Sequence, residues 1–121
     1  MMSLHESAEM YLETIYVLTE RSDSVRSIDV AEHMGFSKPS VSRAVGLLKR
    51  GGYLNMADDG LLSLTDAGRE AAKKIFERHT VLSEFLALIG VDDEIAAKDA
   101  CKIEHVVSDE TIQAIKKYMN K

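Results

Sequence analysis

Three residues near the C-terminus, Cys101, Glu104 and His105, are of types that bind transition metals in proteins. Their spacing of i, i+3 and i+4 would place all three on one face of a helix. A thiolate, a carboxylate and an imidazole together suit a divalent transition metal. The same residues also fit a surface Glu–His pair beside a half-buried thiol, so this pattern alone leaves metal binding open.

Three further residues are candidate ligands from other parts of the chain. Met10 and Glu13 lie about one turn apart in the first predicted helix, and His79 falls in the middle of a long one. Taken singly, each fits an ordinary role: a core methionine, a solvated glutamate and a packing histidine. They become ligands only if the fold brings them beside Cys101.

A second group of residues, from Ser37 to Arg50, has the pattern of a DNA-reading helix. Val41, Val45 and Leu48 are spaced to face a core, which leaves hydroxyl and basic side chains on the other side. Small hydroxyl residues and an arginine near a helix N-terminus suit the major groove. The predicted DNA-binding residues are Arg43 for a base contact, Arg26, Ser37, Ser40 and Arg50 for phosphates, and Lys38, Pro39 and Ser42 beside them.

The elements that would position the DNA-binding residues follow from local signals. Apolar spacing predicts a helix over 7–19, and Ser27 is the expected N-cap of a short helix over 28–34 that ends at Gly35. Ser37 caps the next helix, which carries a proline in its first turn and stops at two glycines, 51–52. Two short apolar runs, 53–56 and 61–64, flank an Asp-Gly turn and predict a β-hairpin. A hairpin directly after the second helix of a helix-turn-helix is a wing.

The sequence pattern predicts helices in the rest of the chain. Thr65 is the expected cap of a long helix over 66–88, followed by a helix over 93–106 and a last one over 109–119 capped by Ser108. The predicted fold class is mainly α: a winged helix-turn-helix domain with a small hairpin wing over 1–66, and a helical dimerisation and metal-binding domain over 67–121. The long helix and the last helix are the expected dimer interface.

Composition narrows the class of protein. The chain has 121 residues, 45% of them hydrophobic, and no run of about 20 apolar residues that would cross a bilayer. Residues 1–9 lack an apolar signal core, and a single cysteine fits a reducing compartment, so we expect a cytoplasmic protein. The net charge is −5, yet residues 26–50 hold five Lys or Arg against two Asp or Glu. A local basic face can bind phosphates on an acidic protein.

Taken together, these motifs resemble the diphtheria-toxin-repressor family, which includes iron-dependent repressors and manganese transport regulators. The resemblance covers nearly the whole chain and is strongest at the last of its segments. The segments that carry it are Glu9–Tyr16, Ser37–Ser42, Leu64–Gly68, Arg78–His79 and Cys101–Glu110.

The resemblance implies a ligand set. In iron-type members, a methionine of the first helix joins the later Cys, Glu and His in one site, which here means Met10, Cys101, Glu104 and His105. Manganese-type members usually have Asp and Glu in place of the Met and the Cys. Sulfur ligands also disfavour Mn(II) relative to softer ions. We therefore expect Fe(II), with Mn(II) as the other candidate and Co(II), Ni(II) or Zn(II) binding in vitro.

A second metal position in the family uses the residue that corresponds to His79. Iron-type members add a Glu and a His at places that hold Ser83 and Ala97 in this chain, so the site departs from their pattern. Glu13 instead matches an acidic residue of manganese-type members. The resemblance thus implies a second site, formed by Glu13 and His79, that shares Glu104. It also implies the shorter, two-domain architecture of the manganese-type regulators. One or two metals per chain both stay open.

The predicted function is metal-dependent repression of metal-uptake genes by a homodimer on double-stranded operator DNA, with the metal as co-repressor. Three alternatives remain. The chain could be a winged-helix regulator that is not gated by metal, or a winged helix that binds protein instead of DNA. A metalloenzyme that uses Cys101, Glu104 and His105 is disfavoured, because no second catalytic group lies at motif spacing, so we expect no enzymatic activity.

Overall fold

The computed structural model describes residues 6–120, in which six helices and one two-stranded antiparallel sheet confirm the predicted fold class. The expectation that residues 1–9 lack a signal sequence falls largely on residues outside this range. No helix within it is both long and apolar enough to span a membrane. The elements are α1 (Glu6–Arg21), α2 (Ser27–Met34), α3 (Lys38–Arg50), β1 (Leu54–Met56), β2 (Leu62–Leu64), α4 (Asp66–Leu88), α5 (Asp93–Ile103) and α6 (Asp109–Met119).

Contacts divide the chain into an N-terminal unit, residues 1–73, and a C-terminal unit, residues 74–121. The boundary falls within α4, so this helix contributes to both units. The predicted domain limit between residues 66 and 67 lies at the N-terminus of the same helix.

The core of the N-terminal unit lies where α1, α2 and α3 pack on one another and against the hairpin. The side chains that α3 was predicted to bury are buried, and α1, which packs on α3, buries three residues, Tyr11, Leu12 and Ile15. Each such side chain contributes roughly 1.5–3 kcal/mol of burial free energy. The fully buried residues of this core are Leu12, Ile15, Val30, Val41, Val45, Leu48 and Leu54.

Local signals set the ends of α2 and α3. Gly35 adopts a φ of 71°, the left-handed conformation that terminates α2. The Ser37 hydroxyl then accepts a hydrogen bond from the Ser40 N–H at 3.3 Å, which confirms Ser37 as the N-cap of α3. The prediction that Ser27 caps α2 is wrong. Arg26 holds that position instead, because the Asp29 carboxylate accepts its backbone N–H at 2.8 Å.

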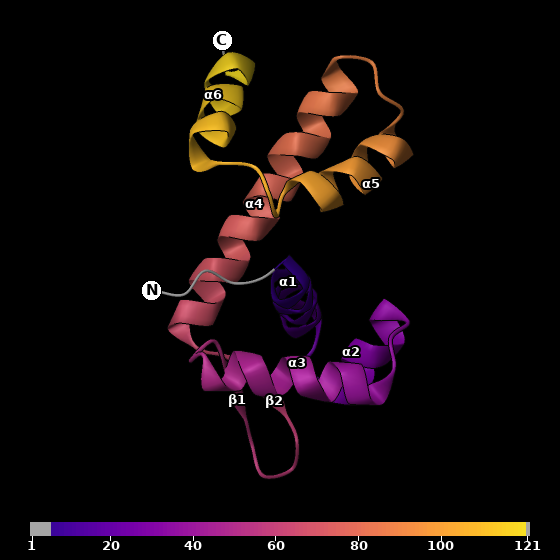
Figure 1. Ribbon diagram of the computed structural model, residues 1–121, viewed down its shortest axis with the longest axis vertical. Coiled ribbons are helices and arrows are strands. Elements are labelled where there is room, and N and C mark those ends of the chain that lie inside the picture. The colour runs from indigo at the N-terminus through magenta and orange to yellow at the C-terminus, as the bar shows by residue number, and fades with distance from the viewer. Residues whose placement is uncertain (1–5, 121) are drawn as a thin grey trace. The chain divides into compact units, whose positions relative to one another are not determined.

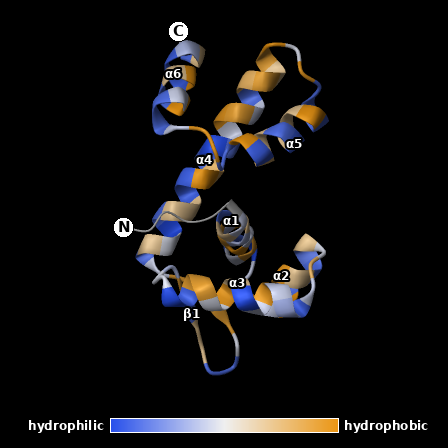
Figure 2. Cartoon of the chain, in the orientation of Figure 1, coloured by the Kyte–Doolittle hydropathy of each residue, from blue (hydrophilic) through white to orange (hydrophobic). Residues whose placement is uncertain are grey.

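The wing extends away from α3 in Figure 1, and Figure 2 shows that the end of its loop is hydrophilic. Its strands pair Leu54 with Leu64 and Met56 with Leu62. The hairpin is tied to the loop before α2, because the Leu62 N–H donates to the Val25 carbonyl at 2.8 Å. This bond fixes the wing relative to the helix-turn-helix.

A close backbone approach joins the wing to α4. The Thr65 hydroxyl accepts from the Gly68 N–H at 3.0 Å, as expected of a cap, and donates to the Gly52 carbonyl at 2.7 Å. A Cβ atom at Gly68 would lie 1.9 Å from the Tyr53 carbonyl oxygen. Only glycine therefore fits at this crossing.

The C-terminal unit contains the end of α4 with α5 and α6 (Figure 1). Its core is formed by Leu82, Ala100 and Ile112, with three half-buried residues around them, Ile103, Val107 and Ile115. Ser108 caps α6 as predicted, accepting the Thr111 N–H at 3.2 Å. The predicted end of the preceding helix is wrong: α5 stops at Ile103, not at residue 106, and a turn leads from it to α6.

Candidate metal centre and nucleic-acid interface

Glu104 is the one charged residue that is fully buried within the described range. It occupies the C-cap of α5, where its N–H still donates to the Ala100 carbonyl. Burying a carboxylate is costly unless a positive or hydrogen-bonding group compensates it. Its surroundings therefore identify what this part of the molecule can bind.

Two candidate ligands contact one nitrogen of His79 on α4. The Glu104 Oε2 atom lies 2.9 Å from His79 Nδ1, and the Cys101 Sγ atom lies 3.6 Å from the same nitrogen. His79 is about one quarter exposed, and Cys101 is exposed. A carboxylate, a thiol and an imidazole thus converge from two helices at a partly accessible position.

The other carboxylate oxygen of Glu104 faces His105. Its Oε1 atom lies 3.3 Å from His105 Nε2, and both side chains are almost completely buried. The two atoms are close enough for an ion pair, but Glu104 Oε1 receives no hydrogen bond from the residues described. A buried carboxylate oxygen beside an imidazole nitrogen is a place where a cation would be stabilised.

These separations fit a metal ligand set. Ligand atoms about 2.0–2.3 Å from one ion are separated from each other by roughly 3–4 Å. The distances of 2.9, 3.3 and 3.6 Å among the four side chains fall in or close to that range. Together with the open hydrogen-bonding position on Glu104, they mean that the residues present suit a divalent transition metal.

The structure therefore brings together four of the predicted ligands: Cys101, Glu104, His105 and His79. The family resemblance implied a second site in which His79 shares Glu104; in the structure His79 lies beside Glu104 and also beside Cys101. The early end of α5 also changes the predicted geometry: Cys101 lies in the last helical turn, and His105 lies in the turn beyond it.

Met10 and Glu13, the other two predicted ligands, lie one turn apart on α1 of the N-terminal unit, and they stay predictions as ligands. Ser83 and Ala97, the places where this chain departs from the iron-type pattern, lie on α4 and α5.

One basic residue beside these candidate ligands, Arg78, is not of a ligand type. Arg78 donates a hydrogen bond from Nη1 to the Glu104 backbone carbonyl at 3.1 Å, and another from Nη2 to the Asp109 carboxylate. Lys74 donates to the same carboxylate at 3.0 Å. The bonds from Arg78 first, and then from Lys74, lower the pKa of Asp109. The sequence signal was its position next to His79, in the short segment Arg78–His79 that carries part of the family resemblance.

The predicted DNA-binding residues share one property: all of them are solvent-exposed, while the apolar side of α3 is buried. Ser37 is committed to capping α3, and its hydroxyl also donates to Ser40. Arg26 lies against the wing, where its Nε donates to the Asp59 carbonyl at 3.2 Å. The assignment of individual residues to bases or phosphates stays a prediction.

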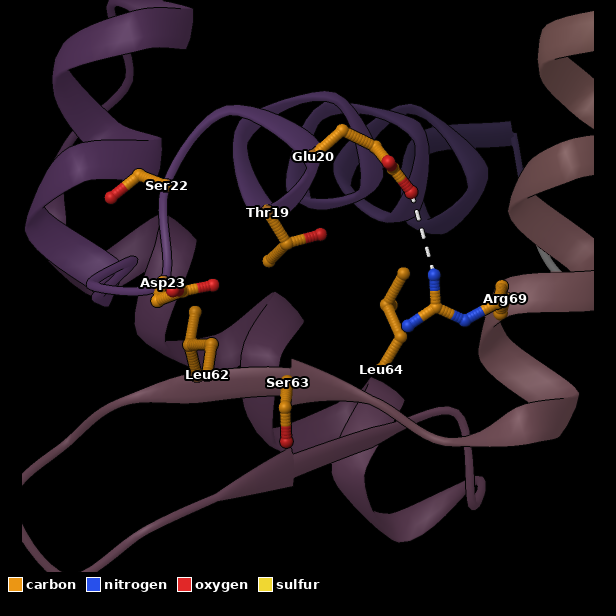
Figure 3. Close-up of a pocket in the computed structure, with 8 residues that line it drawn as sticks. All are labelled: Thr19, Glu20, Ser22, Asp23, Leu62, Ser63, Leu64 and Arg69. Atoms are coloured by element: carbon orange, nitrogen blue, oxygen red, sulfur yellow. Dashed lines mark hydrogen bonds and ion pairs between the residues drawn. The ribbon is translucent and has the colours of Figure 1, made fainter.

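A pocket of about 270 Å³ lies elsewhere in the N-terminal unit, between the end of α1, the loop that follows it, β2 and the first turn of α4 (Figure 3). Arg69 reaches across it and donates to the Glu20 carboxylate at 3.4 Å. Its lining combines three hydroxyl residues with Asp23, Glu20 and a single arginine. The pair ties α4 to α1, which is a structural role.

Comparison with known proteins agrees with this arrangement of elements. Residues 3–62 match the family model of the N-terminal DNA-binding domain of iron-dependent repressors, and residues 65–121 match that of their metal-binding and dimerisation domain. The chain belongs to this family of metal-dependent transcriptional repressors, whose members are transcriptional regulators and not enzymes.

Three relatives illustrate the range of the family. An uncharacterized HTH-type transcriptional regulator of Methanocaldococcus jannaschii is 33% identical over 98% of this chain and 96% of its own. The diphtheria toxin repressor of Corynebacterium diphtheriae is 34% identical over 98% of this chain and 53% of its own. The structure of the manganese regulator SloR is 28% identical, with a TM-score of 0.84, over 98% of this chain and 55% of its own. The chain thus spans about half the length of the last two.

Proposed function

We propose that this chain is a cytoplasmic, metal-activated transcriptional repressor. It binds operator DNA as a homodimer and controls genes for metal uptake. The observation that carries the proposal is the buried Glu104 carboxylate, which has one oxygen beside His79 and the other beside His105. Metal binding is the simplest compensation for its charge. Membership of a family of metal-dependent repressors supports the same conclusion.

The primary site in this proposal consists of Met10, Cys101, Glu104 and His105. Glu13 and His79 supply a second position that shares Glu104. A thioether and a thiolate are softer ligands than carboxylates, so the proposed co-repressor is Fe(II), with Mn(II) as the competing candidate. The metal would supply positive charge to a buried carboxylate and link ligands from distant parts of the sequence.

The action of the metal follows from where the ligands lie in the chain. Met10 and Glu13 belong to the N-terminal unit, and the other ligands belong to the C-terminal unit. An ion held by both would restrict their relative orientation. In a two-fold dimer, that orientation sets the spacing of the two α3 helices, which must match two half-sites of an operator. The metal then favours the DNA-competent state because it binds that state more tightly.

The first test is direct metal binding. Anaerobic protein is titrated with Co(II), a spectroscopic substitute for Fe(II), and the ligand-field and thiolate-to-cobalt bands are recorded. Wild-type protein should show both bands. Cys101→Ala should lose the charge-transfer band, and Cys101→Ser, which keeps the size of the side chain but has no sulfur, should lose it too. A wild-type protein without either band would exclude the proposed site.

The second test is DNA binding. Labelled promoter DNA from a neighbouring metal-transport operon is titrated with protein in chelator, in Fe(II) and in Mn(II), at several salt concentrations. Tight binding only with Fe(II) supports the proposal. Preference for Mn(II) would mean that the carboxylates set selectivity. Salt-dependent binding unaffected by chelator would instead support a winged-helix regulator that is not gated by metal, and no salt-dependent affinity would favour a protein-binding winged helix.

A further inference from the structure

Arg78 makes two hydrogen bonds that join three helices of the C-terminal unit. Its side chain is only 15% exposed, and it starts from α4 next to His79. One nitrogen donates to the backbone carbonyl of Glu104 at the end of α5, and another donates to the carboxylate of Asp109 in the first turn of α6. An arginine is suited to this task because its planar guanidinium holds several donors in a fixed geometry.

The bond to Glu104 satisfies an acceptor that the helix itself leaves open. The last carbonyls of a helix have no N–H partner one turn further on, and Glu104 is the C-cap of α5. A donor from outside α5 therefore fixes the orientation of this peptide group. Because the carbonyl and the carboxylate belong to one residue, fixing the first restricts where the second can point.

The bond to Asp109 holds the other side of the same turn. Asp109 follows Ser108, the N-cap of α6, and also receives a bond from Lys74. The segment between these two anchors contains His105. The Arg78 guanidinium thus holds both ends of the segment from Glu104 to Asp109, in which the side chains of Glu104 and His105 face each other.

We propose that Arg78 is a positioning residue of the metal centre, which acts through the Glu104 carbonyl to keep the Glu104 carboxylate between His79 and His105. The inference rests on the proposed function, since it concerns the affinity of the same metal site. Neither the ligand pattern nor the family comparison assigns this role to Arg78. Residues that orient ligands without touching the ion typically change metal affinity by about 10–100-fold.

Three variants separate positioning from general stability. Arg78→Lys keeps a positive charge near Asp109 but cannot donate to both acceptors in the same planar arrangement. Lys74→Met removes one partner of Asp109 and leaves the bond to the Glu104 carbonyl in place. Lys116→Met removes a different link between α4 and α6, the ion pair of Lys116 with Glu77.

The experiment is Co(II) titration of the full chain and these variants under anaerobic conditions, with thermal unfolding of the metal-free proteins as a parallel measurement. Arg78→Lys should lose about tenfold or more in Co(II) affinity and show altered ligand-field bands. Lys74→Met and Lys116→Met should stay within about twofold of wild type, because each removes an ion pair with at least one exposed partner, and such pairs contribute little. Melting temperatures identify any variant that is merely less stable.

The outcomes are distinct. Wild-type affinity and an unchanged spectrum in Arg78→Lys would overturn the role of Arg78 while leaving the metal site intact. An equal loss in Lys74→Met would also overturn it, because the effect would then come from docking of α6. A wild-type protein that does not bind Co(II) would overturn the proposed function and this inference together.

Discussion

The predicted DNA-reading helix, α3, and the candidate metal centre are built in opposite ways. In α3, the residues predicted to bind DNA are exposed on a helix whose ends are set by neighbours in sequence, Ser37 at one end and Gly51 at the other. In the C-terminal unit, the Glu104 and His105 side chains are buried and that of His79 is partly buried, while Cys101 is exposed. These candidate ligands meet only because α4 and the end of α5 pack together. The predicted DNA-binding site is the exposed face of one helix, whereas the candidate metal centre lies where two helices pack together.

This difference has an energetic consequence. Exposed side chains of α3 can change without disturbing its buried face, so substitutions there should alter binding and leave stability nearly constant. Glu104 carries a buried charge, so substitutions there should alter metal binding and stability together. The metal itself should stabilise the folded chain, because a ligand that binds only the native state lowers its free energy.

The largest expected effect comes from Glu104→Gln. This change keeps the shape of the side chain but removes the charge that a cation compensates, so Co(II) affinity should fall more than about 100-fold, beyond the usual effect of residues that only orient ligands. Wild-type protein should gain about 2.7 kcal/mol of stability when Co(II) is present at 100 times its Kd. In the variant, thermal unfolding should show no such gain. If the variant gained as much stability as wild type, Glu104 would not be a principal ligand of the metal.

Gly68→Ala tests whether the N-terminal unit, like the C-terminal unit, depends on a contact between residues distant in sequence. Its new Cβ would clash with the Tyr53 carbonyl, a backbone atom that cannot rotate away, so we expect a loss of about 3 kcal/mol in the free energy of unfolding. Gly46→Ala in α3 is the matched control. Its Cβ would lie 3.6 Å from an Arg50 side-chain atom, and alanine should stabilise the helix by roughly 0.5–1 kcal/mol. Denaturant titrations that rank the two in the reverse order would refute the argument.

Arg43→Ala tests the exposed surface of α3 directly. Arg43 is exposed on α3, so its removal should leave the denaturant midpoint within about 0.5 kcal/mol of wild type. Operator affinity should fall by about 1–3 kcal/mol if the side chain contacts a base. Arg50→Ala is the control for a phosphate contact: it should weaken binding to all sequences alike and lower the salt slope by about one. Equal behaviour of the two variants would remove Arg43 from base recognition.

The same contrast explains how much could be predicted from sequence. Hydrophobic spacing, caps at Ser37 and Ser108, and the Asp-Gly turn of the wing predict most elements, since each depends on residues near one another in the chain. The errors at Ser27 and at the end of α5 are also local. At Ser27 an Asp29–Arg26 bond replaces the serine cap, and α5 ends where the chain turns towards α6.

The candidate metal centre was only partly predictable, because its geometry depends on how α4 and the end of α5 pack together. Cys101, Glu104 and His105 could be selected by residue type and spacing, whereas the contact of His79 with Cys101 required the two helices to be placed. Arg78 could not be selected by ligand chemistry at all. It acts through a backbone carbonyl, and any residue has one.

The smallest expected effect concerns the pH dependence of stability at Asp109. Its pKa is lowered in the folded protein, mainly by the hydrogen bond from Arg78 and then by that from Lys74. The stabilisation is therefore present above the pKa of the unfolded chain, about 3.9, and is lost as the pH falls through the lower, folded value. Melting temperatures of metal-free wild type and Asp109→Asn should differ at neutral pH and converge on acidification.

The background in which Asp109→Asn is made decides which partner matters more. In Lys74→Met the stronger bond, from Arg78, remains, so most of the difference between Asp and Asn at position 109 should persist. In Arg78→Lys that difference should shrink, and so should its dependence on pH, because a lysine donates from a single nitrogen and cannot reproduce the planar two-nitrogen bonding of Arg78 to Asp109 and the Glu104 carbonyl. If the two backgrounds behave alike, Asp109 senses only the sum of nearby positive charge. The turn between α5 and α6 would then not be held by specific hydrogen bonds from Arg78, and this difference between the candidate metal centre and the exposed surface of α3 would disappear.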